Sequence, residues 1–128
     1  MKPDTSFWKS MQHLLITNSL IIDRPKGSSH PRYPNIRYPL DYGYLEYTTS
    51  SDGGGIDVWL GSLNTVMMED GDKTLTGILC TFDTLKCDAE IKLLIECSEE
   101  DIQVIRDFHK EMYTLYIPNP AAEHDLSN

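Results

Sequence analysis

The chain has 128 residues, of which 40% are hydrophobic and 24% are charged, as in an ordinary soluble globular domain. This length predicts a single domain over residues 1–128, and no apolar run reaches the roughly 20 residues of a membrane helix. A formal net charge of -9 disfavours a nucleic acid partner, because an acidic surface repels a polyanion. An anionic substrate would need cations to accompany it, and this directs attention to carboxylates that hold metal ions.

The opening residues and the cysteines predict a cytoplasmic protein without a membrane anchor. Residues 1–18 show no small-residue cleavage pattern of a secretory signal. The cysteines, Cys80, Cys87 and Cys97, form an odd set without C-x-x-C spacing, which predicts reduced thiols rather than disulfides. Cys80 and Cys87 with His109 would be the donors of an alternative zinc site, for which the spacing is a weak signal.

Helical spacing of apolar residues predicts one helix near each end of the chain. The first covers residues 4–17, with Asp4 or Thr5 as its N-cap. The second opens at Ser98, has acidic residues in its first turn and extends through the stretch SEEDIQVIRDFHKEMYTLY. Its apolar face would consist of Ile102, Ile105, Phe108 and Met112. Residues 118–128 have little to bury, so a mobile tail is predicted there.

Strands are predicted between the two helices. The runs at 19–23, 56–63, 76–83 and 90–97 are rich in β-branched and apolar residues, and 68–77 includes a turn. In the last strand Ile91, Leu93, Ile95 and Cys97 alternate with polar residues, which predicts that one face is buried. Residues 24–44 contain four prolines, so we predict a long ordered loop there. This order of elements predicts a small β-barrel or curled sheet with the C-terminal helix packed on it.

Two pairs of aspartates are candidates for a metal site. Asp52 and Asp57 enclose three glycines, and Asp83 and Asp88 enclose TLKC with the same separation of five positions. Carboxylates from two turns would supply the oxygen ligands that Mg²⁺ prefers. The glycines would allow the backbone to bend tightly beside an ion. The plain alternatives are a solvated hairpin turn for the first pair and Asx-type turns for the second.

Four stretches in a shared order resemble the soluble, family I inorganic pyrophosphatases. IIDRPKGSSHPRY, residues 21–33, is similar to their strand I-E-I-P-K-G-S…K-Y, and YPLDYGYL, residues 38–45, is similar to Y-P-x-D-Y-G-F/Y-I. DGGGIDV corresponds to their signature D-G-D-P-x-D-V, and GILCTFDTLKCDAEIK follows G-x-L…D-x-x-x-x-D-x-K. The resemblance covers about residues 20–110.

The resemblance implies an activity, a fold and a set of site residues. The activity would be Mg²⁺-dependent hydrolysis of pyrophosphate or a related small phosphoanhydride by a metal-bound hydroxide. The fold would be mainly β (α+β), an OB-like closed β-barrel carrying both helices, and family members are often homo-oligomers. The implied metal ligands are Asp52, Asp57, Asp83, Asp88 and, as a supporting carboxylate, Asp23. Asp57 and Tyr42 would be catalytic, and the substrate-binding residues would be Arg32, Arg37, Lys92 and Tyr42.

Departures from the family pattern leave a second hypothesis open. Gly54 stands where the signature has its middle aspartate, and Glu90 stands at the position of a family lysine, for which Lys92 could substitute from the same strand face. The Tyr-Lys pair of the family's C-terminal helix has only weak counterparts in Lys110 and Tyr113. The chain would then be a catalytically impaired module that binds phosphate or nucleotide ligands for regulation or assembly. The plain alternatives for single residues are that Tyr42 packs as an ordinary aromatic residue under the proline-rich loop and that Arg32 and Arg37 are surface charges of an acidic protein.

Overall fold

The computed structural model of the chain describes residues 4–63 and 73–122. The helices are α1 (Thr5–Thr17) and α2 (Glu99–Phe108). The strands are β1 (Leu20–Arg24), β2 (Asp41–Leu45), β3 (Ile56–Leu60), β4 (Leu75–Asp83), β5 (Asp88–Ile95) and β6 (Tyr113–Pro118). Among the described helices, none has the length and apolar character that a membrane span requires.

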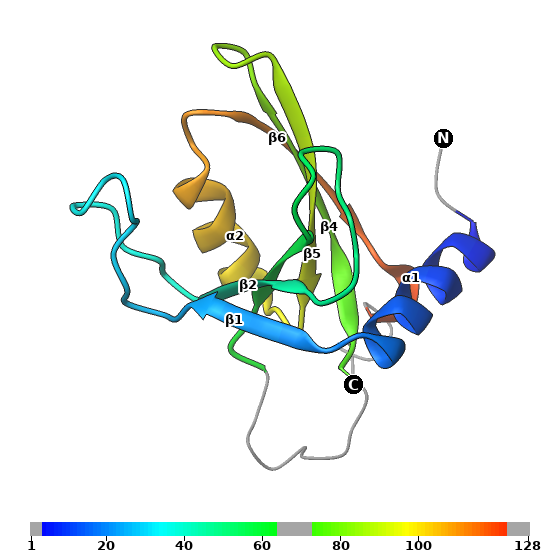
Figure 1. Cartoon of the computed structure of the whole chain (residues 1–128). Coiled ribbons are helices and arrows are strands. Elements are labelled where there is room, and N and C mark those ends of the chain that lie inside the picture. The colour runs from blue at the N-terminus through cyan, green and yellow to red at the C-terminus, as the bar shows by residue number, and fades with distance from the viewer. Residues whose placement is uncertain (1–3, 64–72, 123–128) are drawn as a thin grey trace.

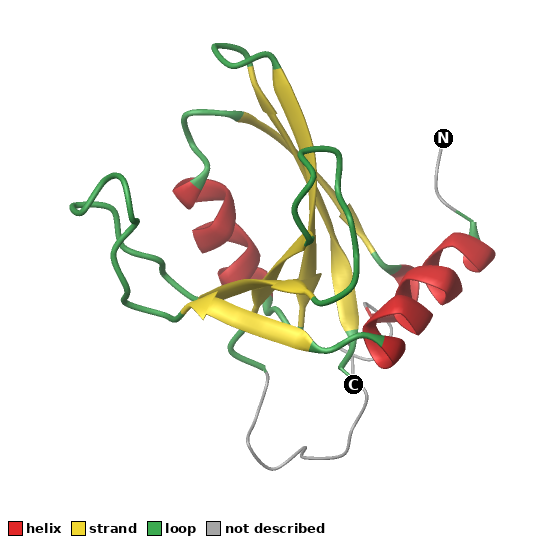
Figure 2. Cartoon of the chain, in the orientation of Figure 1, coloured by secondary structure: helices red, strands yellow, loops and turns green. Residues whose placement is uncertain are grey.

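The strands form one six-stranded mixed sheet in the order β1-β2-β3-β5-β4-β6 (Figure 1). All neighbours are antiparallel except β3 and β5, which pair in parallel. In Figure 2, β1 and β2 run across the view whereas β4 and β5 run along it, so the sheet is strongly twisted. Helices α1 and α2 lie at different sides of this sheet.

The predicted closed OB-like barrel is wrong, because the sheet is open. Among the described strands, β1 pairs only with β2 and β6 pairs only with β4, so the two edges do not meet. Trp8 of α1 lies in a core cluster against which Leu20 of β1 and Ile117 of β6 also pack. Side chains of α1 therefore occupy space between the edge strands that a closing ladder would need. The expectation of a mainly β fold with flanking helices is consistent with the structure.

Both faces of the central strands are covered. One core cluster joins Trp8 of α1 to Val58, Ile78 and Leu93, and the other joins Ile105 of α2 to Trp59, Leu79 and Leu94. Because adjacent residues point to opposite faces of a strand, β5 is buried on both sides from Lys92 to Ile95. The prediction of one buried face for this strand was wrong there, since each face carries its own helix.

The helix starts were predicted correctly, but the end of the second helix was not. Asp4 Oδ1 accepts a hydrogen bond from the backbone N–H of Phe7 at 3.0 Å, and the capping box at Ser98 opens α2. Helix α2 ends at Phe108, whereas the prediction continued it past Met112. The chain turns at residues 109–112 and returns as β6, whose backbone groups pair with β4.

Two further predictions differ from the structure. The proline-rich segment at 24–44 ends in strand β2, because Asp41–Leu45 pairs with β1 on one side and β3 on the other. Part of the predicted mobile tail is anchored: Asn119 is buried, and its Nδ2 donates to the Leu75 carbonyl at 2.8 Å. Residues 123–128 of that tail and residues 68–72 of the predicted turn lie outside the described residues.

Candidate active site

The three glycines between β2 and β3 have different roles. Gly53 adopts φ +90°, a conformation that other residues rarely reach. Gly55 lies against β2, where an added Cβ would come 2.8 Å from Tyr44 Cδ2. Gly54 has no such restriction, since its Cβ would meet only Asp52 Oδ1 at 3.4 Å. Asp52 Oδ1 caps the turn by accepting from the Gly54 N–H at 2.9 Å. Because an added Cβ at Gly54 has room, the absence of a carboxylate at this position has no steric cause.

Lys92, Asp57 and Tyr42 form a hydrogen-bonded group across three strands. Asp57 of β3 stands opposite Lys92 of β5 in the parallel ladder. Lys92 Nζ lies 3.0 Å from Asp57 Oδ2 and 2.9 Å from the Tyr42 hydroxyl, and Lys92 is only 4% exposed. Burial, together with the charge of Asp57 and a hydrogen bond to it, raises the pKa of Tyr42, so this phenol stays protonated. Lys92 was expected only as a substitute for the family lysine at the position of Glu90, and its pairing with Asp57 is a finding of the structure.

Three of the predicted carboxylates gather near Glu90. Burial raises the pKa of the Glu90 carboxyl, Lys92 opposes this effect, and the charges of Asp57, Asp88 and Asp52 add to it. Asp88 and Glu90 lie on the same face of β5 as Lys92, which pairs with Asp57. Glu90 was not among the predicted site residues. Its alternation with Asp88 and Lys92 along β5 was the signal that could have identified it.

The remaining predicted carboxylates are less integrated. Asp83 Oδ1 accepts from the backbone N–H groups of Leu85 and Lys86, at 3.0 and 3.2 Å, so Asp83 forms an Asx-type turn. Asp83 also stands opposite Asp88 across the β4–β5 hairpin. Asp23 is exposed at an irregularity of β1, and no contact described in the structure connects it to the other carboxylates.

The described part of the chain contains no group of three or more His, Cys, Asp or Glu side chains close enough to hold a metal ion. The structure thus does not assemble the alternative zinc donors, Cys80, Cys87 and His109. The chemistry of the acidic side nevertheless fits Mg²⁺, which binds through one or two carboxylates and keeps several waters. Among the described residues Lys92 forms its ion pair with Asp57, and a divalent cation would offset the charge of the neighbouring carboxylates.

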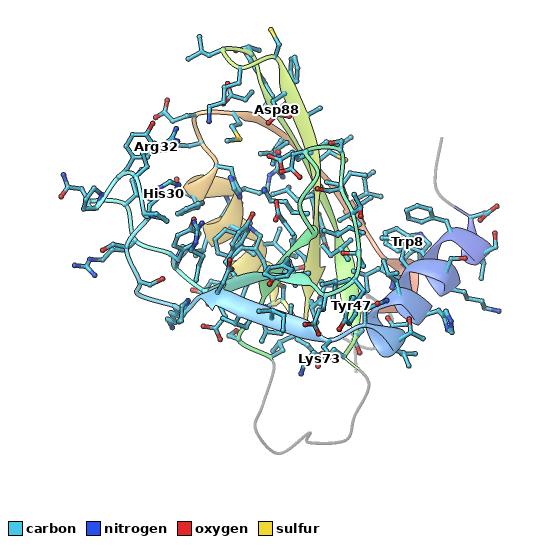
Figure 3. All side chains as sticks on the ribbon, viewed as in Figure 1. Trp8, His30, Arg32, Tyr47, Lys73 and Asp88 are labelled. Atoms are coloured by element: carbon cyan, nitrogen blue, oxygen red, sulfur yellow. The ribbon has the colours of Figure 1, made fainter. Side chains whose placement is uncertain are left out.

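A loop at residues 24–40 carries basic and aromatic residues and contacts Tyr42 through Tyr38. Tyr38 of the loop packs against Tyr42 with ring centroids 5.4 Å apart and against Phe108 of α2 at 5.1 Å. Arg37 is exposed and donates to the Gly27 carbonyl at 3.0 Å, and Arg32 is exposed beside His30. Figure 3 labels His30 and Arg32 on this loop and Asp88 at the β4–β5 hairpin.

Buried His109 supports the aromatic floor of the site. Trp59 packs edge to face against Tyr42, with centroids 4.7 Å apart, and donates from Nε1 to His109 Nε2 at 3.2 Å. Burial, with a smaller contribution from Lys92, lowers the pKa of His109 to about 3, so its imidazole is a neutral acceptor. The sequence offered His109 only as a donor of the alternative zinc site, and it gave no signal of the buried partner Trp59.

A groove of about 700 Å³ lies on the sheet face away from Lys92. Its lining includes Phe82, Ile91 and Leu115 together with Glu90, and it contains no arginine or lysine. This groove therefore offers no cation to an anionic ligand.

The fold of the chain is similar to that of a solved inorganic pyrophosphatase. An inorganic pyrophosphatase (ppa) from Coxiella burnetii superposes with a TM-score of 0.51 and 15% identity, over 83% of this chain and 88% of that protein. An inorganic phosphatase from Anaplasma phagocytophilum gives a TM-score of 0.49 and 15% identity, over 84% and 86%.

Sequence comparisons add no relative to this likeness in fold. No protein-family model matches the chain, and no curated protein matches it in sequence. At 15% identity the first superposition establishes the fold alone. The activity must therefore be argued from the site.

Proposed function

We propose that the chain hydrolyses pyrophosphate, or a related small phosphoanhydride, in a reaction that depends on Mg²⁺. The observation that supports this most directly is the hydrogen-bonded group of Lys92, Asp57 and Tyr42, with Asp88 and Glu90 on the same face of β5 as Lys92. Such a site offers carboxylate oxygens to divalent cations. The Lys92 ammonium and the Tyr42 hydroxyl, which are hydrogen-bonded to each other, are donors for phosphoryl oxygens. We assign the metal-binding role to Asp52, Asp57 and Asp88, with Asp83 and Asp23 as outer supports.

Bound Mg²⁺ would offset the charge of the substrate and lower the pKa of a coordinated water. Lys92 supplies a fixed positive charge for a phosphoryl oxygen, because its ammonium is already oriented by Asp57. Tyr42 supplies a protonated hydroxyl, because its raised pKa keeps the proton in place at neutral pH. Arg32 and Arg37 of the basic loop would contact the phosphate that departs.

The proposal is tested by orthophosphate release from pyrophosphate with Mg²⁺. Wild type should release phosphate, and Asp88→Asn should lower the rate at least tenfold, because a metal ligand is weakened. Asp107→Asn on the exposed side of α2 is the matched control and should keep the wild-type rate. Gly54→Asp should raise the rate by up to the roughly 10²- to 10⁴-fold of a general base, since an added Cβ fits there.

A phosphate-binding module without turnover is the second candidate. Asp57 is already paired with Lys92, and the turn has glycine at position 54 where the family has an aspartate. Both features would weaken catalysis and leave the binding of phosphate in place. Absence of phosphate release with Mg²⁺, Mn²⁺ and Zn²⁺, combined with measurable affinity for imidodiphosphate, would refute hydrolysis and support this module.

A further inference from the structure

Lys92 is a lysine with almost no access to solvent. It is 4% exposed on the interior strand β5, next to Leu93 and Leu94, which are fully buried. Lysine side chains are almost never buried to this degree unless an opposite charge accompanies them. The sheet also fixes its position, because Lys92 stands opposite Asp57 in the parallel ladder of β3 and β5. The ammonium is therefore held inside the candidate active site.

Two side chains satisfy the Lys92 ammonium. Its Nζ donates to Asp57 Oδ2 at 3.0 Å and to the Tyr42 hydroxyl at 2.9 Å. Nζ also lies 5.3 Å from the centre of the Tyr42 ring, within the range of a cation–π contact. Asp57 is the main partner, because a hydrogen bond between two charged groups is stronger than one to a neutral hydroxyl. If Lys92 left Asp57, it would become a buried charge with only a phenol as its partner.

The turn before β3 has a glycine where the resemblance has a further carboxylate. Gly54 stands at that position, and Asp52 Oδ1 accepts from the Gly54 N–H and from the Ser50 hydroxyl. Asp52 is thus oriented by its own turn, whereas Asp57 takes its charge partner from β5. The charge of Asp57 is therefore balanced by a side chain of the protein itself.

A divalent cation at Asp57 would meet the charge of Lys92 on the same carboxylate. The ammonium lies 3.0 Å from Oδ2, which is the contact distance of an ion pair. Two cations at one carboxylate repel each other, and solvent screens this repulsion poorly because Lys92 is buried. Within residues 4–63 and 73–122, no three His, Cys, Asp or Glu side chains converge closely enough to hold a metal ion. A ready set of acidic ligands that would offset the repulsion is thus not in place among these residues.

We infer that the Lys92 ammonium takes the place of one divalent cation at Asp57, so that Mg²⁺ binds this carboxylate only in competition with Lys92. The inference rests on the proposed function for the choice of Mg²⁺. It gives Lys92 a role in metal affinity that is separate from contact with phosphate. Because a lysine of an interior strand cannot dissociate, its charge stays in the site at every metal concentration. The site then binds Mg²⁺ more weakly than its aspartates alone would.

Titration calorimetry with MgCl₂ on the full chain, without substrate, tests the competition. Lys92→Met removes the ammonium and should raise the affinity for Mg²⁺ about tenfold or more, because the repulsion at Asp57 is lost. Lys92→Gln is also neutral and can still donate to Asp57, so it should raise the affinity too and decides the case if Lys92→Met does not fold. Lys9→Met removes the same charge from an exposed position on α1 and should stay within about twofold of wild type.

Asp57→Asn in the Lys92→Met background locates the effect. This double variant lacks the carboxylate for which the two cations compete, so the gain in Mg²⁺ affinity should disappear. A second measurement is the rise in Tm that a fixed concentration of Mg²⁺ causes. A ligand that binds the folded chain more tightly stabilises it more, so this rise should be larger for Lys92→Met than for wild type or for the double variant.

The outcomes separate this inference from the proposed function. If the Lys92 variants bind Mg²⁺ no more tightly than wild type, or if Lys9→Met gains as much as they do, the competition is refuted, whatever the phosphate-release assay gives. Persistence of the gain in the double variant would also overturn it, because the ion would then bind elsewhere. If the Lys92 variants gain affinity through Asp57 but wild type releases no phosphate, the competition stands and hydrolysis is refuted.

Discussion

Replacing Asp57 by Asn would leave the Lys92 ammonium charged at a position that is 4% exposed. Removal of one partner from a buried ion pair costs about 3–5 kcal/mol. The Asp57 side chain is 24% exposed and the Tyr42 hydroxyl still accepts from Lys92, so part of this cost is relieved. We expect Asp57→Asn to lower the free energy of unfolding by about 2–4 kcal/mol.

The interaction itself is measured by a double-mutant cycle. Lys92→Met leaves a carboxylate that water and Tyr42 partly satisfy, so it should cost less than Asp57→Asn. The combination of both changes should cost less than the sum of the two, with a coupling free energy of at least about 1 kcal/mol. The double variant costs less than this sum because it leaves neither charge without its partner.

Urea unfolding at pH 7, followed by tryptophan fluorescence, provides these free energies. The dependence on urea concentration should be unchanged among the variants, so that midpoint shifts report stability. Asp107→Asn on α2 is exposed and should remain within about 0.5 kcal/mol of wild type. Additive effects of Asp57→Asn and Lys92→Met, or a loss below about 0.5 kcal/mol for Asp57→Asn, would refute the buried pair.

Two further predictions concern pH and packing. The folded pKa of His109, about 3, lies below the ordinary 6.5, so its contribution to stability is full above pH 6.5 and is lost as pH falls toward 3. The free energy of unfolding of the wild type should fall by about 2 kcal/mol through His109 between pH 7 and pH 5. His109→Gln keeps an acceptor for Trp59, so its free energy of unfolding, measured by urea titration, should depend less on pH. Equal pH dependence of the two proteins would contradict this. Gly43→Ala would place a Cβ against the Ile21 carbonyl and should lower Tm sharply, whereas Gly54→Ala should change it little. Similar Tm values for these two variants would show that β1 does not pack on β2 as described.

Local signals in the sequence predicted the helix starts and most strands. The caps at Asp4 and Ser98 depend on neighbouring residues only, so their interactions can be recognised without tertiary contacts. Strand β2 could not be recognised among prolines, because its backbone groups are satisfied by β1 and β3, which are distant in sequence. The same holds for β6, whose pairing with β4 overrides a helical pattern.

The site was predictable where side chains meet by strand register. Asp57, Tyr42 and Lys92 were expected in one site, and the ladders place their polar atoms in contact, although their chemical roles stay predictions. The role of His109 beside Trp59 was missed because it arises from tertiary burial, whereas Glu90 was missed although its alternation with Asp88 and Lys92 along β5 is visible in the sequence. The closed barrel was predicted wrongly, since nothing in the alternation of β5 indicated a helix on each face.

Among the described strands, the parallel ladder between β3 and β5 joins two antiparallel halves of the sheet. The half β1-β2-β3 pairs strands that follow one another in the chain, whereas the half β5-β4-β6 pairs β4 with β6 across α2, and the junction pairs Asp57 with Lys92, which are 35 positions apart. Long-range ladders of this kind form late in folding. The ion pair spans that junction, so it comes into existence only when the halves dock. Any change that loosens the junction would dismantle the polar group while leaving each half's own hairpins intact.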